Sequence, residues 1–169
     1  MVGTKRAQNG LTVIELMLTI AVAGVLLAMA VPVMRGFIMD NRLTAQANAL
    51  VNAIKIARTE AVKRRVSMEV APISGDWDNG WLVRDVAKTI TVFNYEMAPG
   101  IEETGGGMPA SIVFRPSGAR SVLTPVVAKL CDDRKKGRRI EIRGLGITSV
   151  CWINYPGRAE ACTSDNSCS

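Results

Sequence analysis

An uncharged apolar stretch near the N-terminus constrains most strongly how this chain can fold. Between Glu15 and Arg35 lie 19 residues without a charge, mostly Leu, Val, Ala, Met and Ile. As a helix that rises about 1.5 Å per residue they span about 29 Å, which is close to the thickness of one hydrocarbon core. Lys5 and Arg6 precede the stretch, and no acidic residue accompanies them. The positive-inside rule therefore predicts a cytoplasmic N-terminus and an exported remainder.

Glu15 does not fit an ordinary membrane anchor. It follows four residues of apolar sequence, and a carboxylate at membrane depth costs about 3 kcal/mol on insertion scales unless it finds a partner. We interpret Glu15 as a functional group that pairs with a cation during assembly. The alternative is a side chain that snorkels to the lipid headgroups.

The residues around Glu15 carry a family resemblance. The string Gly10-Leu11-Thr12-Val13-Ile14-Glu15-Leu16 resembles the class III signal of type IV pilins and type II secretion pseudopilins. The resemblance implies that a prepilin peptidase/N-methyltransferase removes residues 1–10 as a leader and methylates Leu11, although phenylalanine is usual at that position. It makes Glu15 the family's fifth-position glutamate, with the Leu11 amine about one helical turn away. Gly24 and Pro32 then bracket the part of the helix that loosens in filaments.

Two other readings of the N-terminus stay open on the residues alone. The chain could carry an ordinary secretory signal that is cleaved after Ala30, or a plain single-pass anchor. Neither reading explains a glutamate placed five residues after Gly10.

The rest of the chain predicts an α+β fold. We expect a transmembrane and assembly helix over residues 11–34, bent near Pro32, and an amphipathic continuation over residues 35–65. Its apolar stripe recurs every three or four residues, at Leu43, Ala47, Leu50, Ile54, Ala57 and Ala61. This stripe should pack on an antiparallel β-sheet domain over residues 66–169. Strands are expected near residues 66–70, 81–83, 89–93, 111–115, 121–130, 139–143 and 147–153, with turns at 74–76 and 78–80 and a loose loop over residues 99–109.

Inner motifs narrow the resemblance to the GspH/FimT branch, which includes FimU-like minor pilins. Residues 57–62 resemble its A-R-x-E-A helix end, residues 76–81 its tryptophan–glycine turn, and residues 114–118 its F-x-P-x-G turn. The resemblance implies a pilin-like fold for almost the whole chain. It also implies a structural subunit rather than an enzyme.

All four cysteines lie in the last 39 residues: Cys131, Cys151, Cys162 and Cys168. An even number in an exported domain predicts two disulfides. Four thiols allow three connectivities, and we expect Cys131–Cys151 and Cys162–Cys168. The chain has no histidine and no C-x-x-C pair, so we expect no metal site, no cofactor and no catalytic residues.

A dense basic cluster follows the first cysteine and is centred on Gly137. It comprises Arg134, Lys135, Lys136, Arg138, Arg139 and Arg143. A solvated hairpin turn is one interpretation, and contact with DNA phosphates is the other. The net charge of +6 falls to +4 without the leader, and no aromatic residues interleave the cluster, which argues against a dedicated DNA site.

The resemblance implies a minor pilin that joins a type IV pilus at or near the tip and supports filament assembly. The alternatives are a minor pseudopilin of a type II secretion system, a DNA-binding pilin and a secreted domain. We expect a bacterial inner-membrane protein with one pass, a periplasmic domain and later incorporation into a pilus or pseudopilus. Its partners would be other major and minor pilin subunits, the peptidase/methyltransferase and the inner-membrane assembly machinery.

Overall fold

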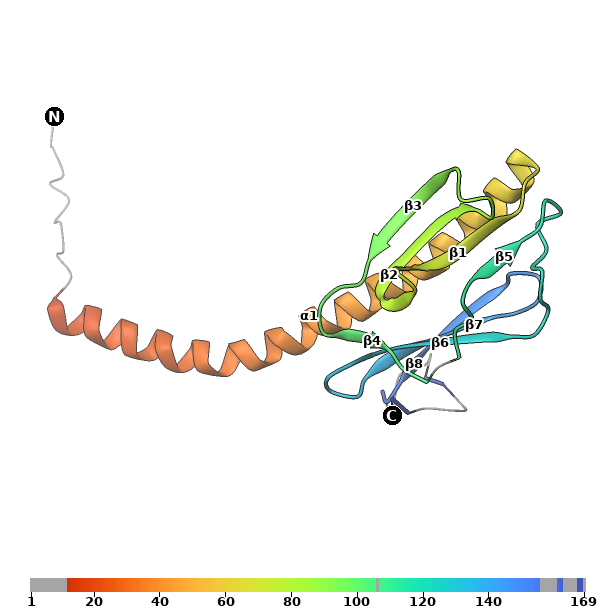
Figure 1. The fold of residues 1–169 in the computed structure, drawn as a ribbon. Coiled ribbons are helices and arrows are strands. Elements are labelled where there is room, and N and C mark those ends of the chain that lie inside the picture. Colours follow the sequence, from red (N-terminus) through yellow and green to blue (C-terminus); the bar gives the residue numbers. More distant parts are fainter. Residues whose placement is uncertain (1–11, 106, 156–160, 163–166, 169) are drawn as a thin grey trace, which may run out of the picture. The chain divides into compact units, whose positions relative to one another are not determined.

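The computed structural model describes residues 12–105, 107–155, 161–162 and 167–168. The chain divides into two compact units, Met1–Ile38 and Met39–Ser169. One helix, α1 (Val13–Arg64), supplies the described part of the first unit and continues into the second (Figure 1). The proposed cleavage site at Gly10 and Leu11 lies outside the described residues.

Local sequence explains where α1 begins and ends. Thr12 caps its first turn, because the Thr12 hydroxyl accepts a hydrogen bond from the Glu15 amide at 3.3 Å. Lys63 and Arg64 occupy the last turn, where cations favour the helix dipole. Arg65 follows with a left-handed φ of 57°, which ends the helix. Helical structure continues through Gly24 and Pro32, so the loosening expected between them stays a prediction for the filament.

The second unit contains two four-stranded antiparallel sheets. The first has the order β3-β2-β1-β5 and the second the order β4-β6-β7-β8 (Figure 1). The strands are β1 (Met68–Ile73), β2 (Asp76–Asp85), β3 (Thr91–Glu96), β4 (Ile101–Glu103), β5 (Ile112–Phe114), β6 (Val126–Asp132), β7 (Gly137–Ile142) and β8 (Thr148–Ile153).

The structure corrects three of the expected strand and loop assignments. The loop expected over residues 99–109 contains β4, which pairs with β6. The turn expected over residues 78–80 lies inside β2, and the pairing of β1 with β2 shifts register between Pro72 and Ile73 to accommodate it. Strand β6 begins at Val126 rather than at residue 121. These differences depend on how the strands pair, which the residue pattern of one segment does not encode.

The apolar stripe of α1 forms one wall of the core. All six predicted stripe residues are buried, from Leu43 to Ala61, and they share one cluster with side chains of both sheets. Trp81 and Phe114 are the largest of the fully buried side chains. The predicted architecture of a helix packed on an antiparallel β domain is therefore confirmed.

Candidate functional site

The first functional feature is an apolar helix surface that the other described residues leave exposed. Every described residue from 12 to 35 is exposed, and Val13, Ile14 and Val33 each expose about three quarters of their surface, 76%, 76% and 75%. Among the described residues, α1 is the one helix long and apolar enough to cross a membrane. Burying such a surface in lipid or among neighbouring helices is favourable by about 25 cal/mol for each Å². This segment therefore needs an apolar environment supplied from outside the chain.

Glu15 lies in the first turn of this surface. Its amide takes part in the cap with Thr12, which gives Thr12 and Glu15 the spacing of a capping box. Its carboxylate has no hydrogen-bond or ion-pair partner among the residues that the structure describes. The side chain is therefore available for a partner outside the described residues, on this chain or on a neighbour.

A group of polar side chains connects α1, near the start of the second unit, with the second sheet. One oxygen of Asp40 accepts a hydrogen bond from Arg134 at 2.7 Å and another from the Tyr155 hydroxyl. Arg134 also binds Asp132 at 2.8 Å through its Nε. We call Asp40, Asp132, Arg134 and Tyr155 the Asp40 cluster. It joins α1 to the β6–β7 turn and to the chain just after β8.

The Asp40 cluster changes the pKa values of its members. Burial opposes ionisation of Asp40, but hydrogen bonds from Tyr155 and Arg134 outweigh it and lower the pKa of Asp40. Burial and the Asp40 carboxylate together raise the pKa of Tyr155. Burial lowers the pKa of Arg134, yet the two carboxylates outweigh that effect and raise it. Asp40 is thus a carboxylate and Tyr155 a neutral donor over the physiological pH range.

Cations and aromatic rings alternate beside the cluster. The Lys136 ammonium lies 4.6 Å from the centre of the Tyr155 ring, which meets the Trp152 ring edge-on at 4.5 Å. The Arg138 guanidinium lies 3.5 Å from the centre of the Trp152 ring. Each cation–π contact favours the folded domain, more so where water is excluded.

These contacts show what most of the predicted basic cluster does in the folded chain. Arg134 binds two carboxylates, Arg138 is buried against Trp152, and Arg139 and Arg143 both contact Glu141, at 3.3 and 3.1 Å. Lys135 is exposed, and Lys136 lies over Tyr155. The six cations thus do not form one solvated turn. The turn itself covers residues 133–136, since Gly137 is already in β7.

The disulfide pairing predicted from the sequence is wrong. The structure pairs Cys131 with Cys168 and Cys151 with Cys162. Cys131 lies on β6 and Cys151 on β8, and β7 runs between these strands with Gly137 facing Cys131 and Arg139 facing Cys151. Two strand spacings amount to about 9–10 Å, whereas a disulfide needs Cα atoms about 4.4–6.8 Å apart. The intervening strand therefore excludes the expected bond.

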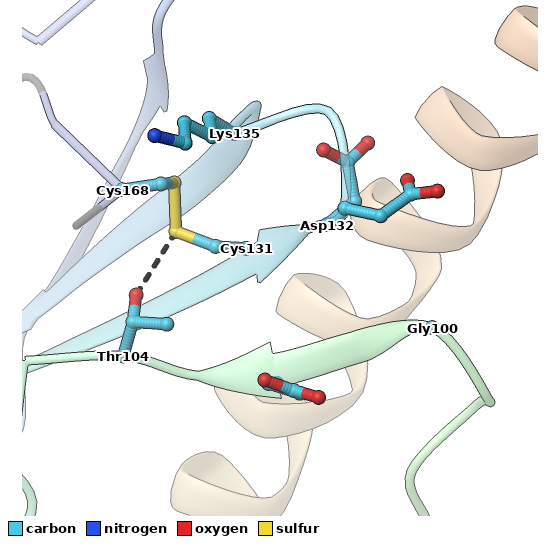
Figure 2. A pocket seen from close by; sticks show the side chains of 8 residues that line it. Gly100, Thr104, Cys131, Asp132, Lys135 and Cys168 are labelled. Carbon is cyan, nitrogen blue, oxygen red and sulfur yellow. Dashed lines mark hydrogen bonds between the residues drawn. A yellow bond between two sulfur atoms is a disulfide. The ribbon is translucent and has the colours of Figure 1, made fainter.

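The first disulfide forms part of the wall of a small cavity, shown in Figure 2. The cavity has a volume of about 160 Å³ and lies between the Gly100–Thr104 segment and the β6–β7 turn. The Thr104 hydroxyl reaches the Cys131 sulfur at 3.1 Å. Neither this cavity nor any other part of the described residues holds a group of three or more His, Cys, Asp or Glu side chains that could bind a metal ion.

Sequence reasoning did not identify the Asp40 cluster. Asp40 and Arg134 are 94 residues apart, and Asp40 and Tyr155 are 115 residues apart. A weak signal existed, because Asp40 is the first acidic residue after the apolar helix segment and lies three residues before Leu43, the start of the buried stripe. No local pattern indicates its partners.

Comparisons with known proteins agree with this geometry. The family model described as type II transport protein GspH matches residues 46–146, and the model of the prokaryotic N-terminal methylation motif matches residues 5–31. No curated protein gives a significant match.

Two similar solved structures are crystal forms of the type IV minor pilin FimU from Pseudomonas aeruginosa strain PAO1. The form in space group P21 has a TM-score of 0.57 at 21% identity, and the likeness covers 68% of this chain and 91% of that chain. The form in space group P65 has a TM-score of 0.53 at 21% identity, and the likeness covers 64% of this chain and 91% of that chain. At this identity the likeness is one of fold.

Proposed function

The chain belongs to the GspH family and carries the N-terminal methylation motif of pilin-type subunits, and from this premise we propose that it is a minor pilin of a type IV pilus. In this proposal it is added in small number, at or near the tip, and supports filament assembly. Subunits of this family assemble with other pilin subunits after prepilin peptidase processing, and the families are structural rather than enzymatic.

The exposed apolar surface of α1 is the observation that carries the proposal. Leu43 is the first fully buried residue of α1, while every described residue from 12 to 35 is exposed. A membrane can cover this surface before assembly, and the helices of neighbouring subunits can cover it afterwards. The basic residues Lys5 and Arg6 favour a cytoplasmic N-terminus and a periplasmic domain before the subunit enters the filament.

A minor pseudopilin of a type II secretion system is the second candidate. The family description names type II transport, which favours this candidate, while the fold likeness to FimU favours the pilus. Both filaments use the same kind of anchor. Locating the tagged subunit in sheared surface pili or in a secretion pseudopilus distinguishes the two functions.

DNA binding is a weaker candidate. The cations proposed for DNA contact are largely engaged inside the domain, and Arg138 is buried. Exposed Lys135 and Arg143 are the better residues to test, because changing Arg138 would disturb packing on Trp152 as well.

Glu15 provides the sharpest test of assembly. We propose that its carboxylate pairs with a cationic amine, on Leu11 or on a neighbouring subunit, when the helix leaves the lipid. The pair offsets the cost of the charge and fixes how far adjacent helices slide past one another. Glu15→Ala should leave the amount of protein in the membrane unchanged and reduce its amount in sheared filaments by at least fivefold.

Glu15→Gln separates the charge from the helix cap. Glutamine keeps the shape and can complete a capping box with Thr12, but it carries no charge. We expect Glu15→Gln to be excluded from filaments as strongly as Glu15→Ala. Leu18→Ala, on the same exposed helix, is the control and should be incorporated. Normal incorporation of both Glu15 variants would refute the assembly role of this carboxylate.

A further inference from the structure

Five exposed aliphatic side chains gather at the end of the domain where α1 stops. We call them the distal patch: Val62, Val122, Leu123, Leu145 and Ile147. Val62 is 49% exposed, and the other four are exposed by 57–66%. Val62 lies 23 residues, or about 35 Å along a helix, from Met39 at the other end of the domain's helix.

Close contacts at glycines bring the segments of the distal patch together. A methyl group on Gly144 would lie 3.2 Å from Cδ2 of Leu123, so the β7–β8 turn touches the segment that precedes β6. A methyl group on Gly118 would lie 3.1 Å from Cγ2 of Val62, which places the turn after β5 against the helix. A methyl group on Gly146 would lie 2.9 Å from Cε1 of Phe114, so the β7–β8 turn also contacts β5.

None of these aliphatic side chains belongs to the core cluster of the domain. Leu145 occupies the turn between two glycines and is 59% exposed, although a polar residue would suit a solvated turn. Single exposed apolar residues are ordinary, but a contiguous group with charged residues around it is typical of a protein interaction site.

Cations surround the distal patch. Arg58, Arg115 and Arg143 are exposed. A methyl group on Gly118 would lie 3.4 Å from Nε of Arg58, and one on Gly146 would lie 3.9 Å from its Cδ. Arg58 and Arg115 form no ion pair with any residue that the structure describes. The nearby carboxylates are already engaged, Glu60 by Lys63 and Arg64, and Glu141 by Arg139 and Arg143. The rim is therefore positively charged.

We propose that the distal patch docks another filament subunit, one that presents apolar side chains flanked by carboxylates. This inference rests on the proposed function. A second copy of the chain docking through the same patch would bring two basic rims together, which costs free energy. DNA would use the arginines but would gain nothing from exposed leucine and isoleucine, since bases stack on aromatic rings.

Photo-crosslinking in cells that assemble filaments tests the proposal on the full chain. A benzophenone side chain in place of Leu123 or Leu145 should crosslink to a different subunit that carries the methylation motif. The crosslinked peptide should contain apolar residues and Asp or Glu. The same side chain in place of Asp133 is the matched control, because the β6–β7 turn lies at the opposite end of β7. Crosslinking at Asp133 should be at least fivefold weaker.

Charge variants of the distal patch give a second measurement. Leu145→Glu should reduce incorporation into sheared filaments by at least fivefold, because it places a carboxylate opposite the partner's carboxylates. Leu145→Lys should reduce it less, and Asp133→Ala should not change it. All three variants should be present in the membrane in normal amounts.

The incorporation and crosslinking results can contradict the distal-patch proposal without contradicting the proposed pilin function. Wild-type protein in filaments, with Leu145→Glu incorporated equally well, would overturn the distal patch alone. Crosslinks from Leu145 only to a second copy, to lipid or to DNA would also overturn it. Absence of the wild-type protein from filaments would overturn both proposals together.

Discussion

At the scale of single residues, Asp40 links the helix to the β domain. Its ionised carboxylate receives hydrogen bonds from Arg134 and Tyr155. Asp40→Asn removes the charge that both donors recognise, while the ion pair between Arg134 and Asp132 remains. We expect a loss of about 1–3 kcal/mol in the free energy of unfolding at pH 7. Urea unfolding of the detergent-solubilised chain, followed by tryptophan fluorescence, measures this loss.

The pH dependence of this stability difference has a definite sign. Because the pKa of Asp40 is lowered in the folded chain, its contribution is complete above the unfolded pKa of about 3.9. It is lost as the pH falls through the lower folded pKa. The gap between wild type and Asp40→Asn should therefore be constant from pH 7 to about pH 5 and shrink below pH 4. Asp133→Asn, in the exposed turn, should differ little from wild type. A gap that widens in acid would contradict this role for Asp40.

At the scale of elements, strand order decides the disulfides. The bond Cys151–Cys162 closes a separation of 11 residues and Cys131–Cys168 one of 37. The chain-entropy model gives about 3 and about 4 kcal/mol for loops of these lengths. Replacing both cysteines of a pair by alanine should thus destabilise the domain, and loss of the longer loop should cost more. Non-reducing peptide mapping should find these two pairs, and a Cys131–Cys151 peptide would contradict the sheet order.

Local sequence patterns predict the helix and most strands, but they do not predict which strands become neighbours. The spacing of Leu43, Leu50 and Ile54 predicts the buried face of α1, because helix periodicity is a local property. The local sequence predicts a loop where β4 lies, because its three residues acquire strand structure only by pairing with β6. The cysteine pairing and the Asp40 cluster were missed for the same reason. Both depend on which strands become neighbours, which the residue pattern alone does not specify.

At the scale of the whole molecule, the family resemblance and the α+β fold predicted from sequence are confirmed. These features reside in local strings, such as the methylation motif, and in the switch from helical to strand periodicity. The distal patch was not predicted, because it combines residues from α1, the segment before β6 and the β7–β8 turn. The predicted basic cluster was identified by sequence proximity, and folding divides its cations among separate contacts.

The last prediction concerns processing, which couples the N-terminus to the use of Glu15. Before cleavage the nitrogen of Leu11 is an uncharged amide and not a free amine. Cleavage after Gly10 creates one on Leu11, four residues or about one helical turn away, and methylation leaves that amine cationic. Mass spectrometry of the membrane-extracted protein should therefore find a mature chain that begins at methylated Leu11.

A processing-deficient variant separates cleavage from membrane insertion. Gly10→Leu should keep the leader, remain in the membrane in normal amounts and be absent from sheared filaments, because Glu15 then lacks its own amine and Lys5 and Arg6 remain attached. Thr4→Ala, which also lies in the leader, should be processed like the wild type. A mature chain that begins at Val31 would instead show removal of the entire apolar stretch up to Ala30. It would then leave the domain without the helix surface through which filament subunits associate.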